Sequence, residues 1–116
     1  MEKFAFNDCG VCSNPKVVLD LVLEKERARA EVRVAQSPCG RWSMGYGAFF
    51  PTHGVGTPVP LVGRGEGYET EDEAVQDGIG RVLEYIDRNG GKVEQKMREL
   101  VEKNMPGRKV VQLTLF

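Results

Sequence analysis

The sequence has no excess of basic residues, since its 16 Lys and Arg face 17 Asp and Glu, and the formal net charge is −1. A protein whose main task is to coat DNA or RNA normally carries a clear basic excess, so this balance argues against that class. Long apolar runs are also missing, because residues 17–23 form the longest one and Asp20 interrupts it. Such a run is too short to span a bilayer.

A secretory signal is missing as well, because polar Asn7 and Asp8 follow the charged start without an apolar run. We therefore expect a cytoplasmic protein with no membrane partner. The 116 residues, of which 41% are hydrophobic and 28% charged, fit one globular domain. Nothing in the sequence predicts an oligomeric state.

Cysteine and histidine are scarce, with three and one residues respectively. An odd cysteine count without an export signal argues against a disulfide framework. Cys9 and Cys12 form a C-x-x-C pair, which Cys39 and His53 would complete as a Cys3His zinc set. An expected strand separates the last two residues, so we favour free thiols and keep zinc as an alternative. We expect no cofactor.

Catalytic motifs are lacking too. His53 lies in a glycine-rich stretch, residues 51–67, with no acidic pair or nucleophile motif beside it. The glycines of that stretch match neither the phosphate-loop spacing nor the dinucleotide-binding spacing. We therefore predict no catalytic residues and a protein that is not an enzyme.

Alternating apolar residues predict three strands, over residues 17–23, 28–35 and 42–50. Good helix formers follow the first of these segments, which leaves a helix as its alternative. Prolines flank a short edge strand expected at residues 59–62. The third strand carries large side chains on one face and small ones on the other, where a helix, a second chain or a ligand could approach closely.

Two helices are expected after the strands. Thr70 and Glu73 stand at capping-box spacing and predict the start of the first helix, which ends near Asn89. Gly78 and Gly80 inside this helix are expected to pack closely on the small-residue face of the sheet. The second helix is expected over residues 92–104, where it meets a Met-Pro-Gly stop.

These elements predict an α+β protein, with an antiparallel three- to four-stranded meander sheet followed by two helices and a C-terminal extended tail or strand. Residues 1–15 are expected to form an irregular N-terminal segment. Residues 16–105 are expected to form a single α+β domain, and residues 106–116 a C-terminal tail or edge strand.

Residues 112–116 read Gln-Leu-Thr-Leu-Phe. This segment resembles the motif with which bacterial proteins bind the DNA sliding clamp, the beta clamp of DNA polymerase III. The family consensus is Gln-Leu, then Ser or Asp, then Leu-Phe, so four positions match and Thr114 is chemically close to Ser. A chance match in one window has a probability on the order of 10⁻⁵.

The resemblance implies how the segment would bind. Leu115 and Phe116 would fill an apolar pocket of the clamp, Leu113 would lie in the adjoining groove, and the amide of Gln112 would hydrogen-bond at its rim. The implied partner-binding residues are Gln112, Leu113, Thr114, Leu115 and Phe116. A small non-enzymatic replication or repair adaptor, or a regulator from a mobile element, is the function that follows.

Other interpretations stay open. Alternating residues 111–115 are also typical of an ordinary edge strand in a structural domain, and such a strand could pair in the free protein and detach to bind. A three-stranded sheet followed by a helix also loosely resembles the double-stranded RNA-binding domain. Its nucleic-acid patch would consist of Arg29, Arg33, Arg41, Trp42 and Arg64.

Overall fold

The computed structural model describes residues 3–105 and the strand at residues 111–115. The elements are β1 (Lys16–Leu23), β2 (Ala28–Gln36), β3 (Trp42–Phe49), β4 (Gly54–Gly56), α1 (Glu71–Asn89), α2 (Lys92–Lys103) and β5 (Val111–Leu115). The first four strands form an antiparallel meander, and β5 runs parallel beside β1, which gives the order β4-β3-β2-β1-β5. The predicted α+β meander followed by two helices is confirmed.

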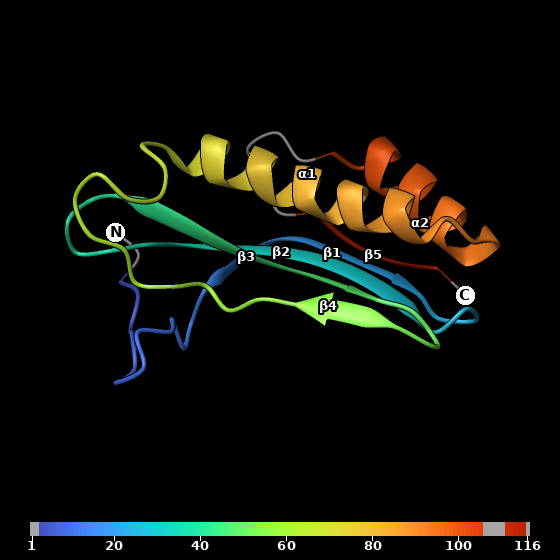
Figure 1. The fold of residues 1–116 in the computed structure, drawn as a ribbon, viewed down its shortest axis with the longest axis horizontal. Helices are drawn as coiled ribbons and strands as arrows, with labels where there is room; N and C mark the ends of the chain where they lie inside the picture. The colour runs from blue at the N-terminus through green and yellow to red at the C-terminus, as the bar shows by residue number, and fades with distance from the viewer. Residues whose placement is uncertain (1–2, 106–110, 116) are drawn as a thin grey trace.

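Both helices lie on one face of the sheet, so the molecule has two layers with the main core between them (Figure 1). The alternation along β2 explains this arrangement, because Ala30, Val32 and Val34 are fully buried against the helices. In α1, a Cβ added to Gly78 would lie 2.6 Å from Cγ1 of Val32. Gly78 therefore packs closely on the sheet as predicted, but on the face opposite the predicted small-residue one, whereas Gly80 has nothing within 4 Å of its added Cβ.

The helices cover the large-residue face of β3 and not the small-residue face that the sequence suggested for close approach. On the small-residue face, an added Cβ at Gly45 would lie 2.7 Å from the carbonyl oxygen of Thr57. Gly47 lies under the ring of Phe49, with an added Cβ 2.6 Å from its Cε2. The small residues therefore make room for the chain's own loop after β4 and for one of its aromatic rings.

A second, smaller core lies where the N-terminal segment crosses the open face of the sheet. Cys12, Ala35 and Val59 are buried there beneath partly buried phenylalanines. The edge strand expected at residues 59–62 is wrong, because Pro60 makes only an isolated bridge to Val11 and the short edge strand is β4. Prolines donate no backbone hydrogen bond, so this stretch packs through its buried valine instead of extending the ladder.

The residues at the ends of α1 and β1 show how these two elements begin and end. The hydroxyl of Thr70 accepts from the backbone N–H of Glu73 at 3.2 Å, so the predicted cap of α1 is confirmed. The charged residues after β1 form a turn in which Arg27 has a φ of 54°, and the helical alternative for that region is wrong. In the described part of the chain, neither helix has the length and apolar character that crossing a membrane requires.

Candidate functional site

The clamp-like segment falls on β5, at one edge of the sheet, and β5 contains four of its five residues. The register pairs are Asp20 with Gln112, Leu21 with Leu113, Val22 with Thr114, and Leu23 with Leu115. Phe116 lies outside the described residues. Of the two forms expected for the end of the chain, residues 111–115 take the edge strand, and docking on a clamp stays a prediction.

β5 has one hydrogen-bonded neighbour, because in the described sheet β1 lies on its inner side and no strand lies on its outer side. Its backbone is already extended, which is the conformation of a peptide that lies along a groove. The segment is therefore at the rim of the fold, joined to the rest by one row of backbone pairing.

Beside β5, the open face of the sheet carries a charge ladder. Two guanidinium nitrogens of Arg29 donate to the two carboxylate oxygens of Asp20 at 2.9 and 3.1 Å. This paired donation raises the pKa of Arg29 above its ordinary value. Glu31 lies between the two arginines of β2, 3.4 Å from Arg29 and 3.3 Å from Arg33. The positive charges of this face are therefore matched by carboxylates within the same sheet.

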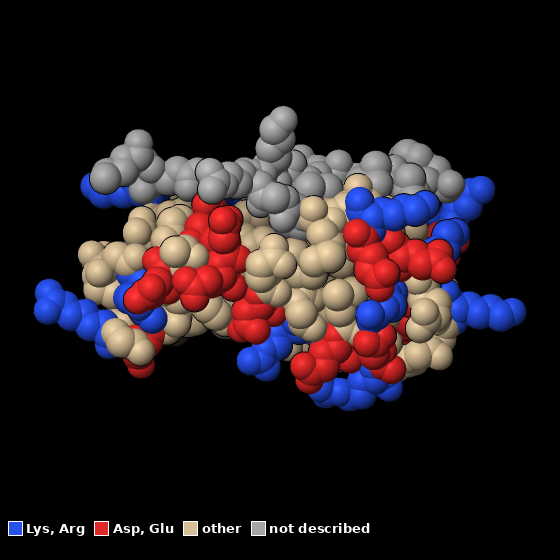
Figure 2. Space-filling view, turned by 90° about the horizontal axis from the view of Figure 1, so that it is seen from above, with Lys and Arg blue, Asp and Glu red and all other residues tan. Residues whose placement is uncertain are grey.

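The five residues of the alternative nucleic-acid patch do not form one surface. Trp42 packs at the main core, on the opposite face of the sheet from Arg29 and Arg33. Arg41 donates to the backbone carbonyls of the loop before α1, and Arg64 is exposed in that loop. Seen over the helices, Lys and Arg are interspersed with Asp and Glu, and acidic side chains gather where α1 begins (Figure 2). Among the described residues, this arrangement gives nucleic acid no continuous basic surface on that face.

The four residues of the alternative zinc set are also not brought together. Cys12 is buried in the smaller core, whereas Cys9 and Cys39 are exposed. His53 is engaged elsewhere, with a tyrosine and a glutamate. Across residues 3–105 and 111–115, no three His, Cys, Asp or Glu side chains lie together as a metal site would require.

The side chain of His53 forms a cluster that the sequence did not predict. Its Nδ1 lies 2.7 Å from the hydroxyl of Tyr85, and its Nε2 lies 2.9 Å from Oε2 of Glu94. Because a carboxylate only accepts, Nε2 donates to Glu94, and in the neutral ring Nδ1 then accepts from Tyr85. Phe50 stacks on the imidazole at a ring-centre distance of 5.0 Å.

This cluster joins three elements, since His53 follows β3, Tyr85 is in α1 and Glu94 is in α2. The hydrogen bond from the imidazole holds the pKa of Glu94 below its ordinary value. The sequence has no acidic pair beside His53, and its acidic partner Glu94 lies 41 positions further along the chain. No local spacing could have revealed a pair that the helix hairpin assembles only in the folded chain.

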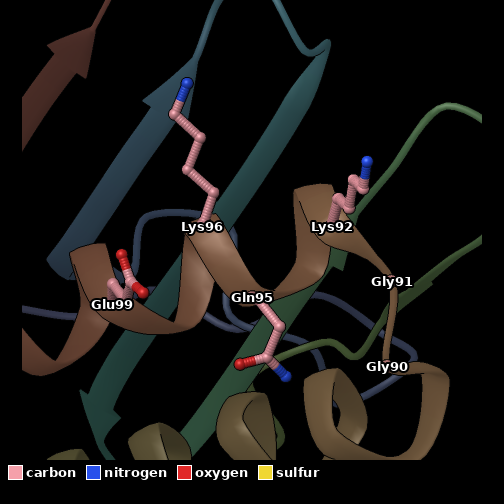
Figure 3. A pocket seen from close by; sticks show the side chains of 6 residues that line it. All are labelled: Gly90, Gly91, Lys92, Gln95, Lys96 and Glu99. Carbon is pink, nitrogen blue, oxygen red and sulfur yellow. The ribbon is translucent and has the colours of Figure 1, made fainter.

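An open hollow of about 570 Å³ lies at the corner between the helices (Figure 3). Its lining residues are Gly90, Gly91, Lys92, Gln95, Lys96 and Glu99. Lys96 reaches across to the turn after β1, where it pairs with Glu26 at 2.6 Å. The hollow is thus bordered by an ion pair between α2 and the turn after β1.

The architecture is a four-stranded meander, a helix hairpin and a parallel edge strand. The chain was compared with protein families, curated protein sequences and solved structures, and no match was found in any of the three.

Proposed function

We propose that this protein docks on the bacterial DNA sliding clamp through residues 112–116. In this proposal the protein is a small, non-enzymatic replication or repair adaptor, or a regulator from a mobile element. It acts in the cytoplasm, where the bacterial clamp encircles DNA. The resemblance of the five residues to the clamp-binding motif carries the proposal. The position of β5 on the sheet rim supports it, because an edge strand can leave without breaking the meander.

The energetics of such docking depend on two apolar anchors. Binding an extended segment costs conformational freedom, which buried side chains must offset. Transfer of Leu115 and Phe116 into an apolar pocket contributes roughly 3–6 kcal/mol before that cost. The remaining residues fix the register of the peptide, and Gln112 supplies the polar contact at the rim.

The charge pattern of the domain fits this indirect route to DNA. The net charge is −1, and the arginines of β2 are paired with carboxylates. A protein of this kind gains little from direct attraction to phosphates. By docking on a ring that already encircles DNA, it would be held at the DNA without a basic surface of its own.

The proposal is tested by titrating purified sliding clamp with the full chain and with a Leu115→Ala, Phe116→Ala double variant. We expect at least a hundredfold weaker binding for the double variant, because both anchors are lost. Thr114→Ser is the matched control, since it brings the third position to the family consensus, and we expect equal or tighter binding.

Thermal unfolding of all three proteins confirms that each one is folded before binding is compared. Equal clamp binding by the natural chain and the double variant would overturn the proposal. The same holds if the natural chain does not bind at all. β5 would then be an ordinary edge strand of a structural domain.

A further inference from the structure

The docking segment is paired with β1 through its backbone. Residues 112–115 pair in parallel with β1, and the pairing extends one residue further, to Leu19 beside Val111. A peptide that lies along a groove of another protein needs its own backbone and side chains free to make that contact. Four of the five docking residues are thus already engaged within the chain.

The register also decides which face of the sheet the apolar positions occupy. Leu113 and Leu115 lie beside Leu21 and Leu23, which are 0% and 1% exposed and belong to the core under the helices. Neighbouring positions in a sheet share a face, because the side-chain period along each strand is two. Positions 113 and 115 therefore fall on the same face of the sheet as Leu21 and Leu23.

We propose that β1 masks the docking segment, so that the clamp and β1 compete for the same residues. This inference rests on the proposed function and adds its regulation. In the closed state, β5 completes the sheet and the motif is hidden. In the open state, β5 leaves β1 and becomes available to the clamp. The observed clamp affinity is then the intrinsic affinity reduced by the fraction of chains that are open.

The edge position of β5 makes this opening feasible. Release of an edge strand breaks one row of pairing, and water can satisfy the freed backbone groups. The strand that is left at the edge carries Asp20 at its centre, on the open face of the sheet and bound to Arg29. A charged side chain in an exposed edge strand disfavours pairing with other chains, so the open state is protected against aggregation.

A reversible cross-link tests the masking. Leu19 and Val111 are register partners, and Val111 lies outside residues 112–116. Strand neighbours are roughly 4.8 Å apart, which is within the range that a disulfide can bridge. We would introduce Leu19→Cys and Val111→Cys into a chain that carries Cys9→Ser, Cys12→Ala and Cys39→Ser. Clamp binding is then measured for the oxidised and the reduced form of this one protein.

We expect the oxidised form to bind the clamp at least tenfold more weakly than the reduced form. Equal binding by both forms would overturn the masking while the proposed function stands. If neither form binds and the natural chain also fails to bind, the proposed function is wrong and the masking falls with it. The reduced form is the matched control, because it carries the same substitutions as the oxidised one.

Hydrogen exchange in the natural chain gives a second test that needs no substitution at buried Leu19. On addition of clamp, we expect those backbone amides of residues 19–23 that face β5 to exchange at least tenfold faster, while those that face β2 keep their rates. The amides that pair β2 with β3 should keep their rates. Unchanged or slower exchange of the β5-facing amides of residues 19–23, with clamp bound, would overturn the masking.

Discussion

The two edges of the sheet are built differently. At one edge, β4 is a three-residue strand whose two glycines lie against the ring of Phe49. The turn before it carries His53, which is hydrogen-bonded to both helices. At the other edge, β5 lies along β1 through parallel backbone pairing over five residues. One edge is fastened to the helix layer by side chains, and the other is joined to the sheet by the backbone pairing of one strand. The comparison teaches that the β4 edge holds the sheet to the helices, while the β5 edge is the one that the proposed docking would use.

The largest change in stability is expected at Gly45, next to the β4 edge. An added Cβ would lie 2.7 Å from the carbonyl oxygen of Thr57 and 2.8 Å from that of Pro58. Backbone atoms cannot move aside as a side chain does, so Gly45→Ala should lower the free energy of unfolding by about 2–3 kcal/mol. Urea denaturation measures the change.

Gly80→Ala is the matched control for that substitution. Gly80 is inside α1 and has nothing within 4 Å of its added Cβ. Alanine should therefore raise the free energy of unfolding by up to about 1 kcal/mol. If the two substitutions changed stability equally, the close approach of the loop at Gly45 would be refuted.

A smaller effect is expected at Glu94, which helps to fasten the β4 edge. Glu94→Gln removes the charged group that accepts a hydrogen bond from His53. It should lower the free energy of unfolding by about 1–2 kcal/mol at neutral pH. Because folding lowers the pKa of Glu94, its contribution is present above the ordinary carboxyl pKa. The contribution is lost as the pH falls through the lowered value.

Urea denaturation at pH 7 and at pH 3 follows this loss, and the gap between Glu94→Gln and the natural chain should narrow in acid. Glu99→Gln, on the same helix and in the exposed lining of the hollow, is the control. We expect it to change stability by less than about 0.5 kcal/mol at either pH. A gap for Glu94→Gln that is the same at both pH values would contradict the role assigned to its charge.

The smallest effect is expected at Asp20, beside the releasable edge. Asp20→Asn weakens a paired contact with Arg29, whose side chain is 49% exposed. Exposed ion pairs contribute little, so the loss should stay below about 1 kcal/mol and disappear at high salt. Unfolding measured at low salt and at 1 M salt tests this, and a loss that salt does not reduce would show a role other than charge pairing.

The sequence predicted the elements well where a single local signal decides them. The alternation of β1, β2 and β3 and the Thr70 cap each depend on neighbours within a few positions. The short edge strand was predicted at residues 59–62 because the apolar Val59 resembles a strand residue. The prolines of that stretch disfavour strand pairing, and the edge strand is β4 instead.

The candidate site divides in the same way. Residues 112–116 could be proposed from the sequence because the motif that they resemble is defined by the order of its residues alone. The contact between His53 and Glu94 could not be found so, because the helix hairpin places them together only after folding. The alternative nucleic-acid patch shows how little residue type says about placement, since Arg29 and Arg33 both pair with Glu31 within the chain.

The parallel pairing of the first and last strands has a consequence for the order of folding. It joins residues near position 20 to residues near position 112, which is the longest-range pairing in the described sheet. Such contacts close the largest loop and form late, whereas the meander and the helix hairpin are built from nearer neighbours. During synthesis the meander and helices emerge first. In this order of folding, the meander and the helix hairpin form before β5 pairs with β1.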